Sequence, residues 1–124
     1  MSQGPRAPLE LTVVVPQSAR VGERVPIVLR LTNASDHPVD AHFLGRTIVF
    51  DIVVSREDGT VVWRRLEGKV TQGILQLRTL QPRQTMEWRD TWRPRARGVY
   101  VIRGELPSDN PLPRRSSETR IHIE

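Results

Sequence analysis

The sequence predicts an all-β protein, an antiparallel β-sandwich of about seven to nine strands. Apolar and polar residues alternate with a period of two in almost every segment, which places alternate side chains on one face of a strand. Turn-forming residues interrupt these segments at intervals of roughly 8–12 residues. No window carries apolar residues at positions i, i+3, i+4 and i+7 over the length of a helix. Together these observations favour a sandwich of short strands.

The first strands are expected soon after the N-terminus. Residues 1–8 lack the apolar run of a secretory signal and are expected to form a flexible tail, with one domain over 9–124. Two alternating segments follow, in which the residues sharing one face are Leu9, Leu11, Val13 and Val15, then Val25, Ile27, Leu29 and Leu31. Pro26 cannot donate a ladder hydrogen bond, so the second of these strands is expected to have a free edge there.

The middle of the chain predicts a hairpin. The turn-rich segment NASDHPVD precedes a strand at 39–43, and alternate residues of FDIVVS again share a face. The EDG sequence at 57–59 predicts a reversal in which Gly59 supplies a positive φ. The chain returns as TVVWRR, which would place Val61 and Trp63 on one face. Further strands are expected at 75–79, 85–92, 99–105 and 119–123.

One local pattern specifies the kind of sandwich. In ARGVYVI, Gly98 lies two residues before Tyr100, and Ile102 lies two residues after it. This is the spacing of a tyrosine corner, in which the phenol binds a backbone carbonyl as the chain enters a late strand. Ile102 occupies the place where antibody domains carry a disulfide cysteine. The pattern predicts an immunoglobulin-like β-sandwich.

Composition indicates in which cell compartment the protein works and which charge its partners carry. The chain has no cysteine, which excludes disulfides and thiolate chemistry and favours a reducing, cytoplasmic compartment. An exported protein is the alternative if a signal peptide precedes this sequence. The net charge of +5 favours acidic partners without identifying one, and Lys69 is the only lysine among 19 basic residues. No apolar run approaches the roughly 20 residues that cross a membrane.

No group of residues predicts an enzyme, and no catalytic residue, metal site or cofactor is expected. His37 and His42 flank a turn with Asp36 and Asp40 beside them, but the segment lacks a third ligand at the spacing that zinc requires. These four are therefore interpreted as loop residues. The triplet NAS at 33–35 matches a glycosylation acceptor and is interpreted as turn chemistry.

The segment WRDTWRPRAR at 88–97 allows two interpretations. Trp88 and Trp92, with four arginines around them, have the composition of a surface that stacks nucleic-acid bases. The same two rings share a strand face with Met86, as residues that fill a core do. The core interpretation is favoured, and nucleic-acid binding is not expected.

The segment ELPSDNPLPRRSSE at 105–118 lies between the last two expected strands. Its prolines, Pro111 and Pro113 among them, exclude a helix or a central strand and reduce the freedom that a loop loses on docking. An extended loop is also the shape that a protease cleft accepts. Arg114 and Arg115 would present a basic dipeptide at its end. A solvated loop without a partner remains the alternative.

Several segments together carry a family resemblance. They are LRLTNASDHPVD, FDIVV, EDGTVVWRR with Gly68-Lys69 and Thr71-Gln72, LQPRQTMEW and RGVYVIRGEL. Over roughly 21–106, the sequence resembles the BsuPI-type intracellular proteinase inhibitor domain of bacteria. It departs from the family pattern at Arg83, where a glycine usually follows the proline, at Val70, where an aromatic residue is usual, and at the Arg64-Arg65 pair.

The resemblance implies an immunoglobulin-like domain that binds and blocks an intracellular serine protease of the subtilisin type through exposed loops. The alternative is an immunoglobulin-like assembly or cell-envelope module without inhibitory activity. Residues expected to anchor the fold are Gly59, Trp63, Trp88, Trp92, Gly98 and Tyr100. Residues expected to contact the partner protein are Arg64, Arg65, Lys69, Gln72, Pro111, Pro113, Arg114 and Arg115.

Overall fold

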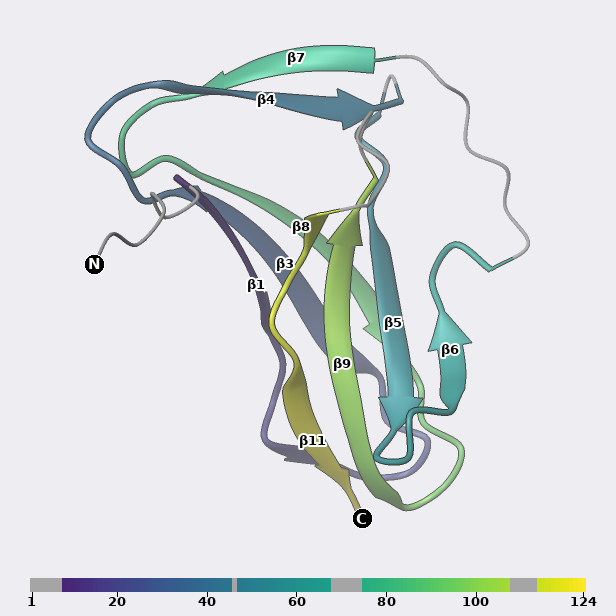
Figure 1. Cartoon of the computed structure of the whole chain (residues 1–124). Coiled ribbons are helices and arrows are strands. Elements are labelled where there is room, and N and C mark those ends of the chain that lie inside the picture. Colours follow the sequence, from purple (N-terminus) through teal and green to yellow (C-terminus); the bar gives the residue numbers. More distant parts are fainter. Residues whose placement is uncertain (1–7, 46, 68–74, 108–113) are drawn as a thin grey trace.

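A computed structural model gives the arrangement of the chain and describes residues 8–45, 47–67, 75–107 and 114–124 (Figure 1). These residues form eleven strands and no helix, so none of their segments is a helix able to span a membrane. The strands are β1 Leu9–Val14, β2 Ser18–Ala19, β3 Val25–Asn33, β4 Val39–Leu44, β5 Asp51–Arg56, β6 Val61–Arg64, β7 Leu75–Leu80, β8 Thr85–Trp92, β9 Gly98–Leu106, β10 Arg114–Arg115 and β11 Thr119–Ile123. The prediction of an all-β fold is confirmed.

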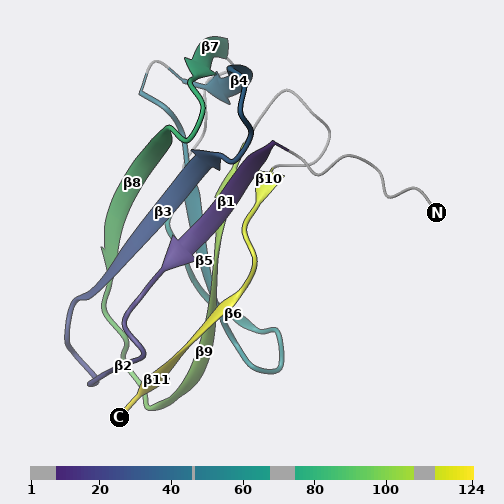
Figure 2. The same ribbon diagram turned by 90° about the vertical axis from the view of Figure 1, so that its left-hand side faces the viewer.

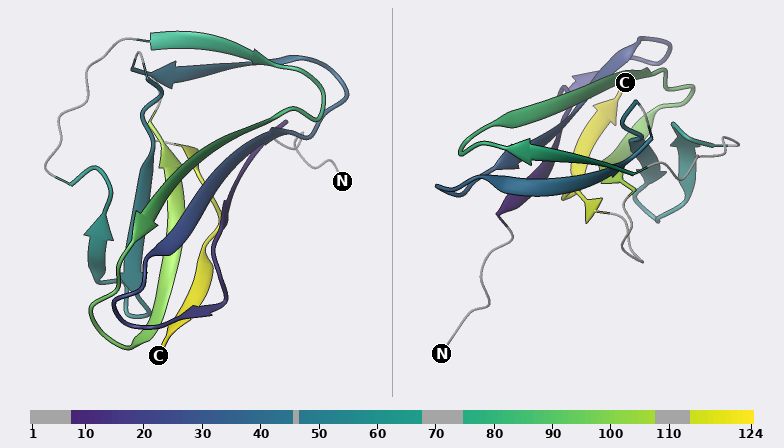
Figure 3. Two further views of the ribbon diagram at one scale, coloured as in Figure 1. Left: turned by 180° about the vertical axis from the view of Figure 1, so that it is seen from behind. Right: turned by 90° about the horizontal axis from the view of Figure 1, so that it is seen from above.

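Two sheets face each other (Figure 2). One has the strand order β1-β3-β8, and the other has the order β2-β11-β9-β5-β6, with β10 paired to β9. All pairs among the described strands are antiparallel except β2 with β11. Strands β4 and β7 form a separate ladder across one end of the sandwich (Figures 1 and 3). Nine strands are longer than two residues, so the predicted antiparallel sandwich is observed at the predicted size.

The core lies between the sheets and is built from alternate residues of their strands. Fully buried members include Val25, Ile27, Leu29, Leu31, Ile52, Val54, Ile102 and Ile121. Burial of each such side chain stabilises the fold by about 1.5–3 kcal/mol. Gly104 of β9 faces this layer, and a Cβ there would overlap Leu29 of β3, so glycine lets the two sheets approach. On the β1 side of β3, the described pairing ends at Val28, so Pro26 lies at the free edge that the sequence predicted. On its other side Pro26 lies opposite Thr91 of β8.

Aromatic rings close the core at both ends. Trp92 and Tyr100 are buried edge to face, with ring centroids 5.0 Å apart, and the Tyr100 hydroxyl donates to the Ala96 carbonyl at 2.8 Å. This bond is the one expected of a tyrosine corner. At the other end Trp88 lies against Phe43 and Phe50, with centroids 5.9 and 6.3 Å away. Trp63 is half-buried against the same core.

The hairpin of β5 and β6 contains a β-bulge. Gly59 has the predicted positive φ, 92°. Trp63 pairs with Val54 but Val61 pairs with Ser55, so the register shifts between them. Val54 and Ser55 point to opposite faces, and the prediction that Val61 and Trp63 share a face is therefore wrong. The extra residue in the bulge is the physical reason, because it breaks the period of two on one strand alone.

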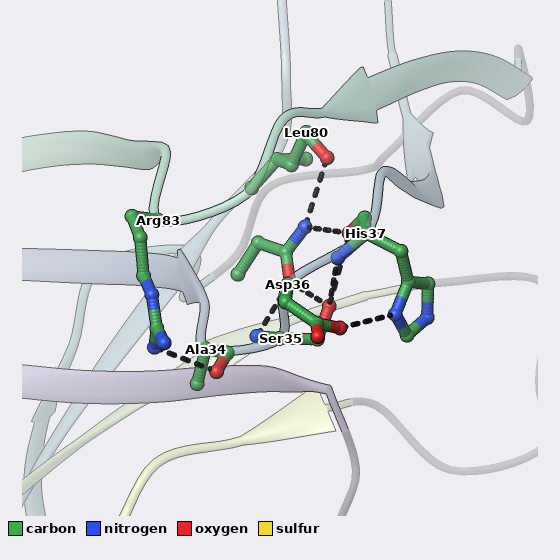
Figure 4. A network of polar contacts seen from close by, with 7 residues as sticks. Ala34, Ser35, Asp36, His37, Leu80 and Arg83 are labelled. Carbon is green, nitrogen blue, oxygen red and sulfur yellow. Dashed lines mark hydrogen bonds and ion pairs between the residues drawn. The ribbon is translucent and has the colours of Figure 1, made fainter.

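Strands β3 and β8 are joined at a bend to β4 and β7, and a network of polar contacts that includes Ser35, His37 and Leu80 lies there (Figure 4). Asn33 is fully buried, and its amide nitrogen donates to the carbonyls of His37 and Leu80 at 2.8 and 2.9 Å. Its side-chain oxygen accepts bonds from the backbone and hydroxyl of Ser35. The interpretation of NAS as turn chemistry is confirmed. In the turn between β7 and β8, Arg83 takes a positive φ of 67°, at the position where the family that the sequence resembles usually has glycine.

Candidate functional site

Two separate segments of the chain meet on the outer face of β5 and β9. Asp51 of β5 lies directly opposite Glu105 of β9, and both are 6% exposed. Arg64, at the end of β6, places its Nε 3.5 Å from Asp51 Oδ2. Arg115 of β10 places its Nε 3.5 Å from Glu105 Oε2. Since β10, β9, β5 and β6 are neighbours in one sheet, these residues form a charged cluster across four strands.

The two carboxylates repel each other, and hydrogen-bond donors around them offset this cost. Arg103, on the outer face of β9, donates to Glu105 at 2.9 Å. Asp51 accepts the backbone N–H groups of Ile52 and Leu66 at 2.9 and 3.0 Å. The Leu66 bond also turns the chain back over the sheet after β6. The carboxylates thus fix both arginine-bearing segments in place.

Arg64 and Arg65 are adjacent in sequence but have different surroundings. The Arg64 side chain is 42% exposed, and its buried Nε has no hydrogen-bond partner within the described part of the chain. Arg65 is 25% exposed; it donates to Asp90 at 2.7 Å and to the Phe50 carbonyl at 2.8 Å. Its guanidinium carbon also lies 3.7 Å from the centre of the Phe50 ring. Arg65 is therefore the less accessible of the two expected contact residues, and it ties the hairpin to β8.

The remaining predicted contact residues divide into two groups. Arg114 and Arg115 are exposed and pair with the last two residues of β9. The others lie outside the described residues: Lys69, Gln72, Pro111 and Pro113. Among the described contact residues, the structure thus brings Arg64 and Arg115 into the same charged cluster.

An open groove adjoins Arg64 along β6. It has a volume of about 580 Å³ and is lined by Val61, Val62, Arg64, Leu66 and Glu67. Val61 and Val62 are 49% and 37% exposed, which is unusual for valine in a strand. Strand β6 is the last in its sheet within the described ranges. The candidate site therefore combines an apolar edge with a guanidinium group.

Sequence reasoning missed the carboxylates that organise this site. Asp51 and Glu105 lie inside strands whose neighbours are apolar, and a polar residue on the outer face of a strand is normally interpreted as solvated. The sequence did offer one signal: an acidic residue, Asp51, stands directly before the apolar run IVVS, and another, Glu105, stands inside YVIRGEL. Only the strand register shows that the two are opposite each other.

Two exposed carboxyl groups outside the charged cluster have a lowered pKa. The backbone N–H of Thr60 binds Asp58 at 2.8 Å and lowers the pKa of that carboxyl below 3.8. The guanidinium groups of Arg89 and Arg30 lower the pKa of Glu87 below 4.5. Both are surface contacts away from the candidate site. Among the described residues, no three His, Cys, Asp or Glu side chains gather as a metal site would require.

Solved structures share this architecture. The CARDB domain of the PF1109 protein from Pyrococcus furiosus, in complex with di-metal ions, is 13% identical, with 94% of this chain and 87% of that chain covered and a TM-score of 0.52. The sporulation control protein Spo0M from Bacillus subtilis is 10% identical, with 95% and 50% covered and a TM-score of 0.59. At such identities the likeness shows the fold alone, an immunoglobulin-like sandwich.

Sequence comparison identifies the family. No curated protein sequence matches the chain. The family model described as BsuPI, intracellular proteinase inhibitor, matches residues 12–111, which include strands β2 to β9, the hairpin among them, and the bend at Asn33. The match covers most of the chain, and the chain belongs to the BsuPI intracellular proteinase inhibitor family.

Proposed function

We propose that the chain is a non-enzymatic domain that binds and blocks a cytoplasmic serine protease of the subtilisin type. The description of its family supports an inhibitor and a protease partner. We locate the contact with the protease at Arg64 and Arg115, because these two arginines pair with the opposed carboxylates Asp51 and Glu105. This pairing holds two exposed arginines from distant segments on one surface.

The charge and shape of this surface suit a protein partner. Three guanidinium groups, from Arg64, Arg103 and Arg115, face two carboxylates, so the cluster has a surplus of one positive charge. The exposed valines of β6 lie beside Arg64 in the groove. Apolar centres flanked by arginine are common where protein interfaces gain most of their affinity. The pre-positioned arginines lose little conformational freedom when a partner docks.

The test is titration of a panel of bacterial serine proteases, subtilisin-type enzymes included, with the purified protein. We expect residual activity to fall in proportion to inhibitor added and the domain to survive uncut. Arg64→Ala, and separately Arg114→Ala with Arg115→Ala, should weaken inhibition about tenfold or more, or ~1.4 kcal/mol. Arg78→Ala with Arg89→Ala is the control, since it removes two exposed arginines elsewhere.

Each outcome has a definite meaning. Full protease activity at equimolar inhibitor across the panel contradicts the proposal. An equal loss in the control pair would mean that net charge, and not this surface, drives binding. If the Arg114 and Arg115 variant inhibits normally while Arg64→Ala does not, the contact lies along β6 and the segment after it.

A second candidate function follows from the edge of β6. Among the described strands β6 is the last in its sheet, and such an edge with exposed Val61 and Val62 is suited to accepting an extended strand of another protein. This observation supports an assembly or cell-envelope module that docks a partner chain without inhibiting it. Complex formation with a protein that leaves all protease activities unchanged would favour this function.

A further inference from the structure

A second pocket lies at the opposite end of β5 and β9 from the charged cluster. Arg56, the last residue of β5, pairs with Tyr100 near the start of β9, at the end of the molecule that is lowest in Figure 1. Trp92 ends β8 on the facing sheet, and Trp63 of β6 completes the wall. The space between them measures about 530 Å³, which falls within the range of roughly 300–1,000 Å³ typical of ligand pockets. The pocket thus lies over the end of the sandwich where Trp92 and Tyr100 close the core.

The aromatic wall of the pocket is held rigidly by its own contacts. Trp92 packs edge to face on Tyr100 at 5.0 Å, and both are buried. The Tyr100 hydroxyl is already bound to the Ala96 carbonyl at 2.8 Å. The half-buried Trp63 ring therefore offers a ligand most of the apolar surface of this wall, whereas Trp92 and Tyr100 expose little and back it rigidly. The tyrosine hydroxyl proton is committed to the protein.

The charged residues that line this pocket are arginines. Among the described residues, Arg56, Arg93 and Arg95 line it and no aspartate or glutamate does, although Glu57 and Asp58 adjoin Arg56 in a neighbouring hollow. Within the described ranges none of the three guanidinium groups has a hydrogen bond or ion pair, and Arg56 acts on Asp58 only through its charge. By contrast, Arg30, Arg89 and Arg120 elsewhere on the surface pair directly with carboxylates. Like charges brought together in this way repel each other and raise the local positive potential.

We infer that this pocket binds an acidic segment of a partner protein, with an apolar side chain of that segment against the tryptophans and its carboxylates on the three arginines. Arginine pairs bidentately with carboxylates, and an aromatic wall supplies apolar contact. A protein is favoured over a nucleic acid because the charge surrounds a bounded concavity. A nucleic-acid strand would need a basic groove that follows its backbone, whereas β8 alternates charges, with Glu87 beside Arg89. The inference goes beyond protease inhibition and uses the other end of the sheet.

The chain offers a site-resolved readout, because it has three tryptophans and two of them line the pocket. The probe is a peptide of alternating glutamate and phenylalanine, with a matched peptide in which glutamine replaces glutamate. The glutamate peptide should shift the indole N–H resonances of Trp63 and Trp92 in NMR spectra and leave that of Trp88 unchanged. Arg93→Gln with Arg95→Gln should weaken binding about tenfold or more. Arg78→Gln with Arg89→Gln, which removes the same charge, should change it less than about twofold.

The same measurements can overturn the inference. Equal shifts from the glutamine peptide would show that the carboxylates contribute nothing. Equal weakening in both arginine pairs would show unspecific attraction to net charge. Absence of any indole shift at low salt would exclude the pocket as a peptide site. Tighter binding of a single-stranded oligothymidine, with affinity falling steeply as salt rises, would assign the pocket to nucleic acid. Protease inhibition is measured separately, and its loss or retention does not decide this result.

Discussion

The two ends of the β5–β9 pair hold arginines in opposite ways. At one end Arg64 and Arg115 lie against buried carboxylates, Asp51 and Glu105. At the other end Arg56, Arg93 and Arg95 lie around aromatic rings and form no ion pair in the described part of the chain, although Arg56 acts on Asp58 through its charge. A paired arginine is fixed in place and contributes to the fold, whereas an unpaired one contributes little until a partner supplies the anion. The same residue type is therefore anchored by the fold at one end and left without an ion-pair partner among the described residues at the other.

The largest expected change in stability comes from the aromatic rings that line the pocket beside Arg56. Trp92→Ala removes a buried ring that packs on Tyr100, and we expect the free energy of unfolding to fall by about 3–5 kcal/mol. Urea denaturation followed by circular dichroism measures this loss. A loss below about 1 kcal/mol would mean that the wall of the pocket is not part of the core.

The next largest change in stability is expected when a buried carboxylate is removed, in comparison with an exposed one. Glu105→Ala leaves Arg103 and Arg115 without their partner, and we expect a loss of about 3 kcal/mol. Glu57→Ala is the matched control, because Glu57 pairs with Arg120 where both side chains are exposed, and its removal should cost less than about 0.5 kcal/mol. Equal losses in the two variants would contradict the assignment of the cluster as a structural element.

A smaller difference in stability is expected between variants of the adjacent residues Arg64 and Arg65. Arg65→Ala removes two hydrogen bonds and the contact with the Phe50 ring, so unfolding free energy should fall by about 2 kcal/mol. Arg64→Ala should cost about 0.5–1 kcal/mol, since this side chain is half exposed. Thermal unfolding of the two variants under identical conditions tests the order, and a larger loss for Arg64 would reverse our interpretation.

The smallest effect concerns the exposed ion pairs of β8. The pKa of Glu87 is lowered by Arg89 and Arg30, so the stability that this pairing adds is present above the unfolded pKa of the group and is lost as pH falls through its folded pKa. Arg30→Gln with Arg89→Gln should return the pKa of Glu87 toward 4.5. NMR titration of the side-chain carboxyl carbon measures the change. An unchanged pKa would show that these surface arginines do not act on Glu87.

Much of the fold was predictable because strand faces follow a period of two. The buried faces of β1 and β3, the turn at Gly59 and the Tyr100 hydrogen bond all follow from local spacing. The candidate site was not predictable to the same degree. It depends on which residue of one strand lies opposite which residue of another, and local patterns do not contain that register. For the same reason the sequence did not distinguish Arg64 from Arg65.

The bulge between β5 and β6 has a consequence for self-association. A straight edge strand with exposed valines would invite the same strand of a second molecule to add to the sheet, which is how many β proteins aggregate. The extra residue near Val62 bends that edge and interrupts the regular spacing of its backbone groups. In two identical molecules the irregularity falls at the same place, so the two edges match each other poorly and a continuous ladder between copies is hard to form. The edge is thus better suited to a strand of a different partner than to a second copy of itself.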